Sequence, residues 1–356
     1  MTNPGLEGVV VADTQISEVD GERGRLVIAG ADVEQLAGAV RFEGAVRRVL
    51  EAGGADPAAL GDDALGAARM AAWQVASRLG DALDHPDAMD ALRTGLGHIR
   101  SHGAGAGDVP DAIAAIGAAP VLVAAWSRLR AGAAAVAPDP GLGHAADYLR
   151  MTLGRPADAA SVRALDAYLV TVIDHAMSAS TFTARVIAST ASDLISAVVG
   201  AVGALKGPLH GGAPAPVLDM LDAIGAPDRA EAWLLGELAA GRRIMGMGHR
   251  VYRVRDPRAA VLEEAVRPLA SPRLELARGV ERAAAKILRE RKPDRPLAAN
   301  VEFYTAVLLD AVGLPREQFA ATFAVSRIAG WSAHVVEQRR TGRLIRPASH
   351  YTGKMP

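Results

Sequence analysis

The chain has 356 residues, of which 50% are hydrophobic and 22% are charged. This balance is typical of folded proteins with an apolar core and excludes a mainly disordered chain. The 39 basic and 40 acidic side chains nearly cancel, so the protein lacks the overall positive field with which proteins bind nucleic acid or anionic membranes. Cysteine is absent, which excludes disulfides, thiolate metal sites and a cysteine nucleophile and fits a reducing compartment.

Residues 1–7 lack a basic stretch followed by an apolar one, so we expect no secretory signal there. The longest nearly apolar stretch, Ala112–Trp126, contains Pro120. It is also shorter than the roughly 18 apolar residues that a membrane span needs. We therefore expect a cytoplasmic protein that binds neither membrane nor nucleic acid.

Sequence typical of strands is confined to the start of the chain. Residues 9–19 and 25–28 are rich in β-branched side chains and flank Asp20-Gly21, a hairpin-type turn. Residues 103–107 contain three glycines but follow no strand, so we expect a flexible loop there and no phosphate-binding turn. The N-terminal region thus predicts a small β element and nothing larger.

The rest of the chain favours helices, because it is rich in Ala and Leu and only 4% of all residues are aromatic. Apolar positions within 161–177 fall on one helical face, and a similar pattern continues as far as Leu194. Capping and terminating residues predict further helices. These are residues 229–240 before Gly241, a helix capped by Asp256, a helix capped by Asn300, and 318–340 before Gly342. We predict a mostly α protein.

Three segments combine residue types that carry chemistry. The first, Leu205–Ala213, places His210 among glycines and proline between two helical patterns. Glycines let the backbone approach a ligand closely, and a loop between rigid helices suits an acid or a base. On residue types alone, an ordinary interhelical turn and an acid–base site explain this segment equally well.

The second segment, residues 244–258, surrounds His249 with four arginines. The planar donor fork of arginine binds carboxylates and phosphates, so this segment favours an anion site over a solvated basic face. The third segment, residues 300–304, places Glu302 in the first turn of a predicted helix. A glutamate commonly lies there because it interacts with the helix dipole. Nothing local marks it as catalytic.

Two common kinds of site are not indicated. The sequence has no His-Glu-x-x-His motif and no histidine–carboxylate pair at zinc spacing, so we expect no metal. The glycines Gly246 and Gly248 lack the third glycine of a dinucleotide-binding turn, since Val251 occupies that position.

Together the three segments resemble the citrate synthase family. The C-terminal two thirds of the chain match the family pattern nearly continuously, whereas residues 50–135 match weakly. The matching runs are Gly5–Val10, Asp20–Gly24, His144–Ala146, Asp174–Phe182, Gly207–Gly212, Gly248–Tyr252, Asp256–Arg258, Ser326–Trp331 and Leu344–Pro347.

The resemblance implies an all-α, two-domain homodimer. The large domain would comprise residues 1–213 and 317–356, and the small domain, residues 214–316, would close over the substrates and exclude water. The expected activity is that of an acyltransferase of the tricarboxylic acid cycle. It would use a CoA thioester as substrate and hold no permanent cofactor.

The reaction of this family condenses acetyl-CoA with oxaloacetate and then hydrolyses the thioester to citrate and CoA. A thioester methyl group is a weak acid, so its removal needs a base together with stabilisation of the enolate oxygen. By resemblance, Glu302 matches the base and His210 matches the group that hydrogen-bonds the thioester oxygen. His249 matches the group that polarises the oxaloacetate carbonyl and protonates the new alkoxide.

The resemblance also supplies binding residues. The positions that hold oxaloacetate are matched by His175, Arg258, Arg327 and Arg346, the last reaching into the neighbouring subunit's site. Contacts with CoA are matched by Arg253, Gly246 and Gly248, with Arg255 as a weaker candidate.

The sequence departs from the family pattern at three positions. Glu302 stands in place of aspartate and is one methylene longer, which changes the reach of the base. Ser178 stands where asparagine is common and offers a single hydroxyl. Pro214 replaces an asparagine, and proline suits the first position of a helix.

Two alternatives stay open. A 2-methylcitrate synthase would use propionyl-CoA, and one additional methyl group changes discrimination by only roughly 1–3 kcal/mol. A non-catalytic relative would bind CoA or a regulatory partner. The histidines and arginines oppose the non-catalytic alternative, whereas Glu302 in place of aspartate keeps it open.

Overall fold

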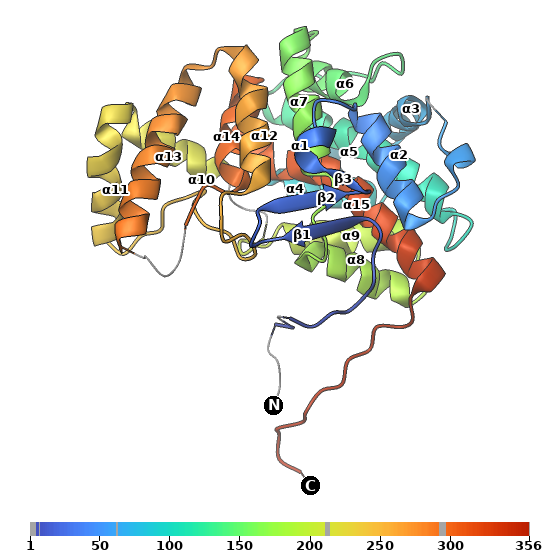
Figure 1. Ribbon diagram of the computed structural model, residues 1–356. Coiled ribbons are helices and arrows are strands. Elements are labelled where there is room, and N and C mark those ends of the chain that lie inside the picture. The colour runs from blue at the N-terminus through green and yellow to red at the C-terminus, as the bar shows by residue number, and fades with distance from the viewer. Residues whose placement is uncertain (1–4, 7, 62, 211–213, 292–296, 356) are drawn as a thin grey trace.

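The computed structural model describes residues 5–6, 8–61, 63–210, 214–291 and 297–355. The described chain is predominantly helical, as predicted, with a three-stranded antiparallel sheet near its start in the order β1-β2-β3 (Figure 1). The strands are β1 (Ser17–Asp20), β2 (Arg25–Ile28) and β3 (Ala31–Asp32). The prediction of an all-α fold with a small N-terminal β element is therefore confirmed.

Fifteen α-helices follow the first strands in the described residues. In chain order they are α1 (Val33–Leu36), α2 (Phe42–Gly53), α3 (Ala64–Ala76), α4 (Ala88–Leu96), α5 (Asp108–Arg130), α6 (His144–Leu153), α7 (Ala159–Thr171), α8 (Ala179–Ser189), α9 (Leu194–Leu205), α10 (Pro214–Ile224), α11 (Ala230–Ala239), α12 (Pro257–Val266), α13 (Pro272–Arg291), α14 (Val301–Ala311) and α15 (Phe319–Thr341).

The first strand is shorter than the sequence predicts. Residues 9–16 are not in a strand, and β1 pairs with β2 only from Ser17 opposite Ile28 to Asp20 opposite Arg25. The partner strand ends at Ile28, and the chain then turns through Ala29 and Gly30, both at positive φ. The Ala29 N–H still donates to the Ile16 carbonyl at 2.8 Å, but residues 9–15 pair with no described strand, which is why β propensity alone overestimates the strand.

The helix predicted over 161–177 ends six residues early, at Thr171. The apolar periodicity continues to Ala176, but Ala176 itself adopts a positive φ of 48°. The next helix, α8, starts at Ala179 after the Ser178 side chain caps it by accepting the Thr181 backbone N–H at 3.3 Å. Residues 172–178 therefore form a loop, and this loop carries His175.

Other predicted helix boundaries are confirmed. The Asp256 side chain caps α12 by accepting the Arg258 N–H, and the Asn300 side chain caps α14 by accepting the Glu302 N–H. Helix α10 begins at Pro214, in keeping with the preference of proline for a first helical turn. Residues 104–107 form a turn before α5, as expected for a loop.

Two long helices, α5 and α15, form the centre of the molecule. Helix α15 packs against α2, α5, α8 and α9, while α5 also contacts α3, α4 and α6. In Figure 1, α10, α11 and α13 lie on one side, α2 and α3 on the other, and α7, α12 and α14 between them. By length and composition α5 could cross a membrane, but 78% of its most apolar stretch is buried inside the protein, as in a core helix.

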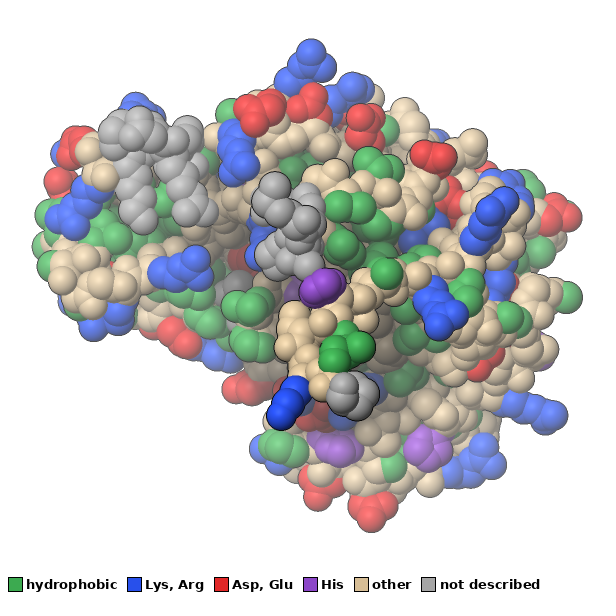
Figure 2. Space-filling view, turned by 90° about the horizontal axis from the view of Figure 1, so that it is seen from below, with side chains coloured by type: hydrophobic (Ala, Val, Ile, Leu, Met, Phe, Trp, Pro, Cys, Tyr) green, Lys and Arg blue, Asp and Glu red, His purple; other side chains and the backbone are tan. Residues whose placement is uncertain are grey.

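The surface carries charges of both signs. On the face shown in Figure 2, basic and acidic side chains are interspersed without a continuous basic area. This distribution agrees with the near balance of charges in the sequence.

Candidate active site

The loop between α7 and α8 positions His175. Its Nε2 atom lies 3.2 Å from the hydroxyl oxygen of Tyr252, and its ring centroid lies 5.5 Å from that of His249. Burial, with the positive charges of Arg258 and Arg327, lowers the pKa of His175 well below its usual value. The imidazole is therefore neutral near pH 7.

The turn after Gly248 fixes His249 and its proton. The Nδ1 atom of His249 accepts the backbone N–H groups of Val251 and Tyr252, at 3.0 and 3.1 Å. The proton of the neutral ring consequently sits on Nε2, which is left as a hydrogen-bond donor. Burial and the nearby Arg258 charge lower the pKa of His249 to about 4.

His210 has the opposite tautomer. Its Nε2 atom lies 3.3 Å from the backbone nitrogen of Ser180, which donates to it, and 2.8 Å from the Ser180 hydroxyl. The indole N–H of Trp331 donates to the same hydroxyl oxygen at 3.1 Å, which leaves the hydroxyl proton for His210 or for the Ser178 hydroxyl, 3.1 Å away. Since Nε2 accepts the Ser180 N–H, the ring proton of neutral His210 is on Nδ1. Burial and the charge of Arg327 lower the pKa of His210. Residues 211–213, the end of the predicted loop, lie outside the described residues.

Arg258 is held rigidly by one carboxylate. Asp256 accepts from the Arg258 side chain at two atoms, at 3.0 and 2.7 Å, and also accepts the backbone N–H of Val301 at 3.1 Å. The start of α12 is thereby tied to the start of α14. Because Arg258 is only 3% exposed, this pairing keeps a buried charge in one orientation.

Arg327 is buried on α15 and incompletely satisfied. Its Nε donates to the carbonyl oxygen of Val172 at 2.8 Å, whereas its Nη2 is buried without a hydrogen-bond partner among the described residues. Burial lowers the pKa of Arg327 to about 10, so the side chain stays charged at neutral pH. An unpaired, charged N–H donor is costly to bury and suits an anionic oxygen.

Glu302 lies in the first turn of α14, where the charges of both Arg258 and Arg327 act on it. Its Oε2 atom is buried and has no hydrogen-bond partner in the described chain. Burial raises the pKa of Glu302 to about 7, although the positive charges of Arg258 and Arg327 oppose the rise. A carboxyl group that titrates near neutral pH is suited to act as a general base.

The structure brings six of the predicted residues to one place, since each interacts through space with at least one of the buried arginines or their neighbours. The residues are His175, His210, His249, Arg258, Glu302 and Arg327. The arrangement combines two buried cations for anionic groups, two histidines with defined N–H donors, and one base.

Arg346 is not part of this group within the chain. It is exposed in the C-terminal segment that leaves the molecule after α15 (Figure 1), and it has no hydrogen bond or ion pair with any described residue. Its predicted role requires a second copy of the chain.

The predicted CoA-binding residues divide into two kinds. Arg253 is about half exposed and only loosely paired, with its Nε 3.9 Å from Glu22. Arg255 instead forms ion pairs with Glu263 and Glu281, each at 2.7 Å. Its charge is therefore compensated within the chain, which weakens the case for a contact with CoA.

Gly246 and Gly248 have a packing function in this structure. Both adopt positive φ, and a Cβ at Gly246 would lie 2.9 Å from the Phe303 side chain. The N–H of Asn300 donates to the Gly246 carbonyl, and its side-chain amide donates to the Gly248 carbonyl. The two glycines thus let the His249 turn pack against the start of α14.

Several supporting residues were not assigned from the sequence. Ser180 and Trp331 orient His210, Tyr252 contacts His175, and Asp256, recognised only as a cap, holds Arg258. The capping pattern was the only local signal among them, because the other contacts join residues far apart in the chain. A further contact of this kind is the hairpin turn at Gly21, which packs against the Val251 carbonyl and leaves no room for a Cβ.

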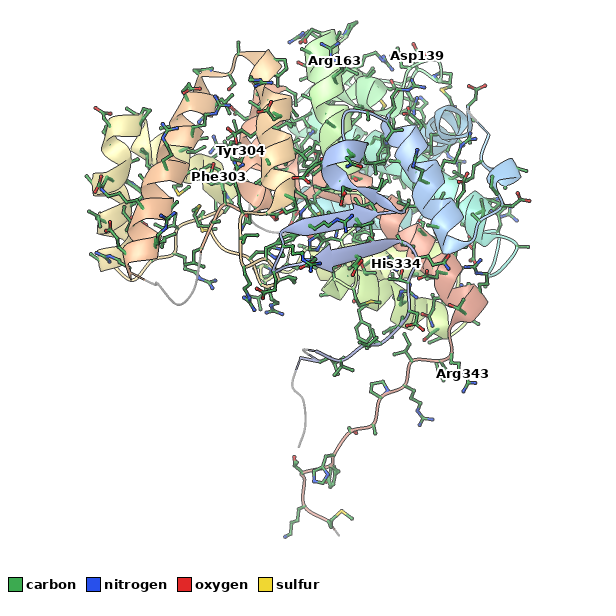
Figure 3. The ribbon with its side chains drawn as sticks, in the orientation of Figure 1. Asp139, Arg163, Phe303, Tyr304, His334 and Arg343 are labelled. Atoms are coloured by element: carbon green, nitrogen blue, oxygen red, sulfur yellow. The ribbon has the colours of Figure 1, made fainter. Side chains whose placement is uncertain are left out.

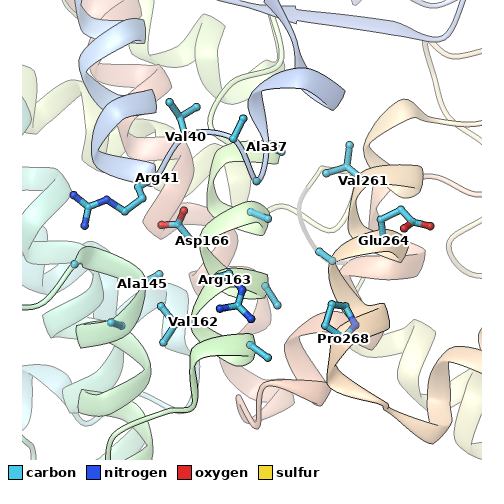
Figure 4. A pocket seen from close by; sticks show the side chains of 18 of the residues that line it. Ala37, Val40, Arg41, Ala145, Val162, Arg163, Asp166, Val261, Glu264 and Pro268 are labelled. Atoms are coloured by element: carbon cyan, nitrogen blue, oxygen red, sulfur yellow. The ribbon is translucent and has the colours of Figure 1, made fainter.

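A separate cavity of about 670 Å³ lies away from these side chains (Figure 4). It is lined mainly by small apolar residues from α6, α7, α12 and the connection between α1 and α2, with charged residues such as Arg163 and Asp166 among them. Among the described residues, no group of three or more His, Asp or Glu side chains could hold a metal ion.

Comparison with known proteins gives a consistent result. The sequence model described as "Citrate synthase, C-terminal domain" matches residues 5–348. Putative citrate synthase 2 of Mycobacterium tuberculosis is 50% identical over 211 residues, which is 59% of this chain and 56% of that protein, so the match spans little more than half of that relative.

Two further relatives align over nearly the whole chain. The citrate synthase of Deinococcus radiodurans is 36% identical, covering 98% of this chain and 95% of that protein. The 2-methylcitrate synthase of M. tuberculosis is also 36% identical, covering 98% and 90%.

Solved structures agree with these relatives. The citrate synthase of Thermotoga maritima superimposes with a TM-score of 0.85 at 34% identity, over 100% of this chain and 97% of that one. The complex of Thermoplasma acidophilum citrate synthase with carboxymethyl coenzyme A and oxaloacetate gives a TM-score of 0.87 at 27% identity, over 99% and 96%.

Proposed function

Because this chain belongs to the citrate synthase family, we propose that it is an acyltransferase that condenses acetyl-CoA with oxaloacetate and releases citrate and CoA. The observation that carries the proposal is the environment of Glu302. Its Oε2 atom is buried without a partner among the described residues, its pKa is about 7, and the charges of the buried Arg258 and Arg327 both act on it. The same two arginines act on histidines that are neutral at that pH. Such a carboxyl group can accept a proton from a weak carbon acid.

The proposed reaction begins with transfer of a methyl proton of acetyl-CoA to Glu302. The Nδ1–H of His210 stabilises the negative charge on the thioester oxygen as the enolate forms. The methyl carbon then forms a bond with the carbonyl carbon of oxaloacetate. The Nε2–H of His249 polarises this carbonyl and gives its proton to the alkoxide. Water finally cleaves the thioester, which yields citrate and free CoA.

In the proposed complex, oxaloacetate supplies the anionic oxygen that Arg327 lacks, since its Nη2 is buried without a partner among the described residues. Arg258 already pairs with Asp256, which holds its guanidinium group in one orientation for a further contact with oxaloacetate. His175 provides a third polar contact. The carboxylates of oxaloacetate suit the planar donor fork of a guanidinium group, of which this site holds two.

The proposed site is built from both proposed domains. His175, His210 and Arg327 belong to residues 1–213 and 317–356, whereas His249, Arg258 and Glu302 belong to residues 214–316. The first boundary lies at residues outside the described part of the chain. Since neither segment contains the complete set, closing the small domain onto the large one would assemble the site and exclude water.

We further propose a cytoplasmic homodimer in which Arg346 of each chain completes the oxaloacetate site of the other. The exposed position of Arg346 outside the body of the chain supports this assignment. The CoA thioester is a substrate in this proposal, and the enzyme needs no permanent cofactor. Arg253 is the preferred candidate for a contact with CoA, because Arg255 is already paired with two carboxylates.

Release of CoA tests the proposed function directly. We expect the protein to release free CoA from acetyl-CoA only when oxaloacetate is present, because base and enolate-stabilising groups act on the thioester in a site completed by oxaloacetate. A thiol-reactive dye measures the product continuously. Folded protein that releases no CoA from either acetyl-CoA or propionyl-CoA would support the non-catalytic alternative.

A second candidate function is 2-methylcitrate synthase. It is supported by the 2-methylcitrate synthase relative, which is as similar to this chain as the citrate synthase of D. radiodurans. The same residues would act on propionyl-CoA, whose reacting carbon carries one more methyl group. The ratio of kcat/KM for the two thioesters decides between the two enzymes.

The pKa of Glu302 predicts a pH profile. We expect kcat/KM for acetyl-CoA, at saturating oxaloacetate, to rise with pH from about 7 upwards, because only the deprotonated carboxylate can accept a proton and bound oxaloacetate offsets the arginine charges that lower the pKa of Glu302. The pKa values of the three histidines are lowered, so these rings are already neutral in that range. Initial rates between about pH 5.5 and 8.5 test this. A flat profile in that range would assign the base to another group.

A further inference from the structure

A buried path of hydrogen bonds begins beside His175. The Oδ2 atom of Asp174 accepts hydrogen bonds from the Ser17 hydroxyl at 2.5 Å and from Nε2 of His334 at 3.2 Å. The Ser17 hydroxyl in turn accepts the backbone N–H of Ala176 at 2.8 Å. The residues on both sides of His175 are thus fixed by side chains from β1 and α15.

The same series of hydrogen bonds continues from His334 to Arg185 in α8. The Nδ1 atom of His334 lies 3.1 Å from Nε and 2.8 Å from Nη2 of Arg185, both of which donate to it. Because Nδ1 accepts from Arg185, the N–H of the His334 ring is on Nε2 and points to Asp174. His334 and Arg185 are at most 1% exposed.

Arg185 connects this path to the end of α15. Its Nη1 donates to Oε1 of Gln338 at 3.0 Å, and its Nη2 forms an ion pair with Glu337. The side-chain amide of Gln338 then donates to the backbone carbonyl of Arg343 at 3.1 Å. Figure 3 labels His334 and Arg343, the first and last residues of the part of the path that runs through Arg185 and Gln338.

Arg343 lies in the segment that leads out of the molecule. Two residues later, the N–H of Ile345 donates to the Ser189 hydroxyl at 3.0 Å, and the exposed Arg346 follows directly. The segment after α15 is therefore held at Arg343 and Ile345, immediately before Arg346.

We propose that Arg185 and Gln338 are positioning residues: Arg185 serves its own active site, and Arg185 together with Gln338 serves the active site of the partner subunit. Through His334 and Asp174, Arg185 fixes the loop of His175. Through Gln338, it fixes the segment that carries Arg346 to the neighbour. This inference rests on the proposed function and on the dimer.

The chemistry of the path supports a positioning role. A buried arginine with its carboxylate and amide partners costs desolvation, and apolar side chains of similar volume often stabilise a protein equally well. The planar donor fork of arginine, however, fixes the directions of several partners at once. An arginine of this kind therefore suits a place where two elements must keep a defined orientation. Here these elements are the His175 loop and the segment that carries Arg346.

The first test uses Gln338→Met, which removes the bond to the Arg343 carbonyl and also the bond that Gln338 accepts from Arg185. We expect the KM for oxaloacetate to rise about tenfold, while kcat changes less than about twofold, because the bond that orders the segment of Arg346 is lost. Arg185 keeps its bonds to His334 and Glu337, so the loop of His175 stays fixed. Arg339→Met is the matched control. Arg339 also anchors the end of α15, through Asp108 and the Ala188 carbonyl, but has no bond to residues 343–346. A similar KM rise in both variants would show a general loss of stability and overturn the proposal.

A second test determines in which site Gln338 acts. In a mixed dimer of an Arg346→Ala chain with a His210→Ala chain, the only complete site lies in the Arg346→Ala chain and receives Arg346 from the other chain. Gln338→Met should raise the KM for oxaloacetate about tenfold when placed on the chain that lends Arg346, and much less on the other chain. Equal effects in both arrangements would overturn the proposal.

The mixed dimers distinguish a failure of the Gln338 inference from a failure of the proposed exchange of Arg346 between subunits. If mixed dimers that carry no Gln338 substitution are inactive, the lending of Arg346 fails before Gln338 is tested, and the inference fails with it. If Gln338→Met does not fold, Ser189→Ala replaces it, because it removes the other bond to the segment, at Ile345. Ser189→Ala should show the same dependence on the chain that carries it, and its absence would overturn the proposal.

Discussion

Replacing Glu302 by glutamine should lower kcat by about 10²- to 10⁴-fold, the usual loss when a general base is removed. Glutamine keeps the shape and the hydrogen-bonding capacity of the side chain but cannot accept the methyl proton. Oxaloacetate should still bind, because Arg258, Arg327 and His249 are unchanged. Titration calorimetry with oxaloacetate measures this binding independently of turnover.

The contrasting explanation of Glu302 is that it only stabilises the start of α14. In that case Glu302→Gln would cost about 0.3–1 kcal/mol of stability and leave the rate unchanged. The burial of Oε2 without a partner argues against this explanation, because a carboxylate that serves only the helix dipole gains nothing from losing its water. Thermal unfolding of the variant, measured beside its kcat, separates the two explanations.

Glu302→Asp probes the additional methylene. We expect a lower rate, because the surroundings of a buried glutamate should be adapted to its length and a shorter arm withdraws the carboxylate from the reacting carbon. A higher rate would show that glutamate is a handicap at this position.

Exchange of the acetyl-CoA methyl protons with deuterated water, in the presence of an unreactive oxaloacetate analogue, isolates the proton-transfer step. This exchange should be lost in Glu302→Gln. Exchange at the wild-type rate in that variant would remove Glu302 from the proposed reaction.

Arg346→Ala and His210→Ala should each be nearly inactive, and mixing the two should restore activity. The physical reason is that the two residues would serve different sites on the same chain: His210 its own, and Arg346 that of the neighbour. A mixed dimer then contains one site with both residues intact. The exposed position of Arg346, outside the body of its own chain, motivates this prediction.

The measurement requires proof that the subunits exchange. Differently tagged variants, mixed and then purified through both tags, yield the mixed dimer, which random exchange produces as about half of all dimers. Its activity should approach half that of the wild-type dimer. Inactive mixed dimers, isolated through both tags, would show that Arg346 does not act across the interface.

Many elements of the fold follow from local sequence. The caps at Asp256 and Asn300, the glycine after α15 and the helix start at Pro214 were all predicted, because each depends on a few neighbouring residues. The errors occur where a distant segment decides the local structure. Residues 9–16 form no strand because β2 is short, and α7 ends before Val172, whose carbonyl is bound by Arg327 from α15.

The sequence by itself determined the helical class, the family and the residue types of the site, because periodicity, capping and motif order are properties of neighbouring residues. Only the tertiary structure decided which of these residues meet and in what state. The raised pKa of Glu302 and the opposite tautomers of His210 and His249 depend on burial and on partners elsewhere in the chain. The path from Asp174 through His334 and Arg185 to Gln338 likewise joins segments about 150 residues apart. Burial and electric fields arise from packing between such distant segments, so no local pattern in the sequence contains them.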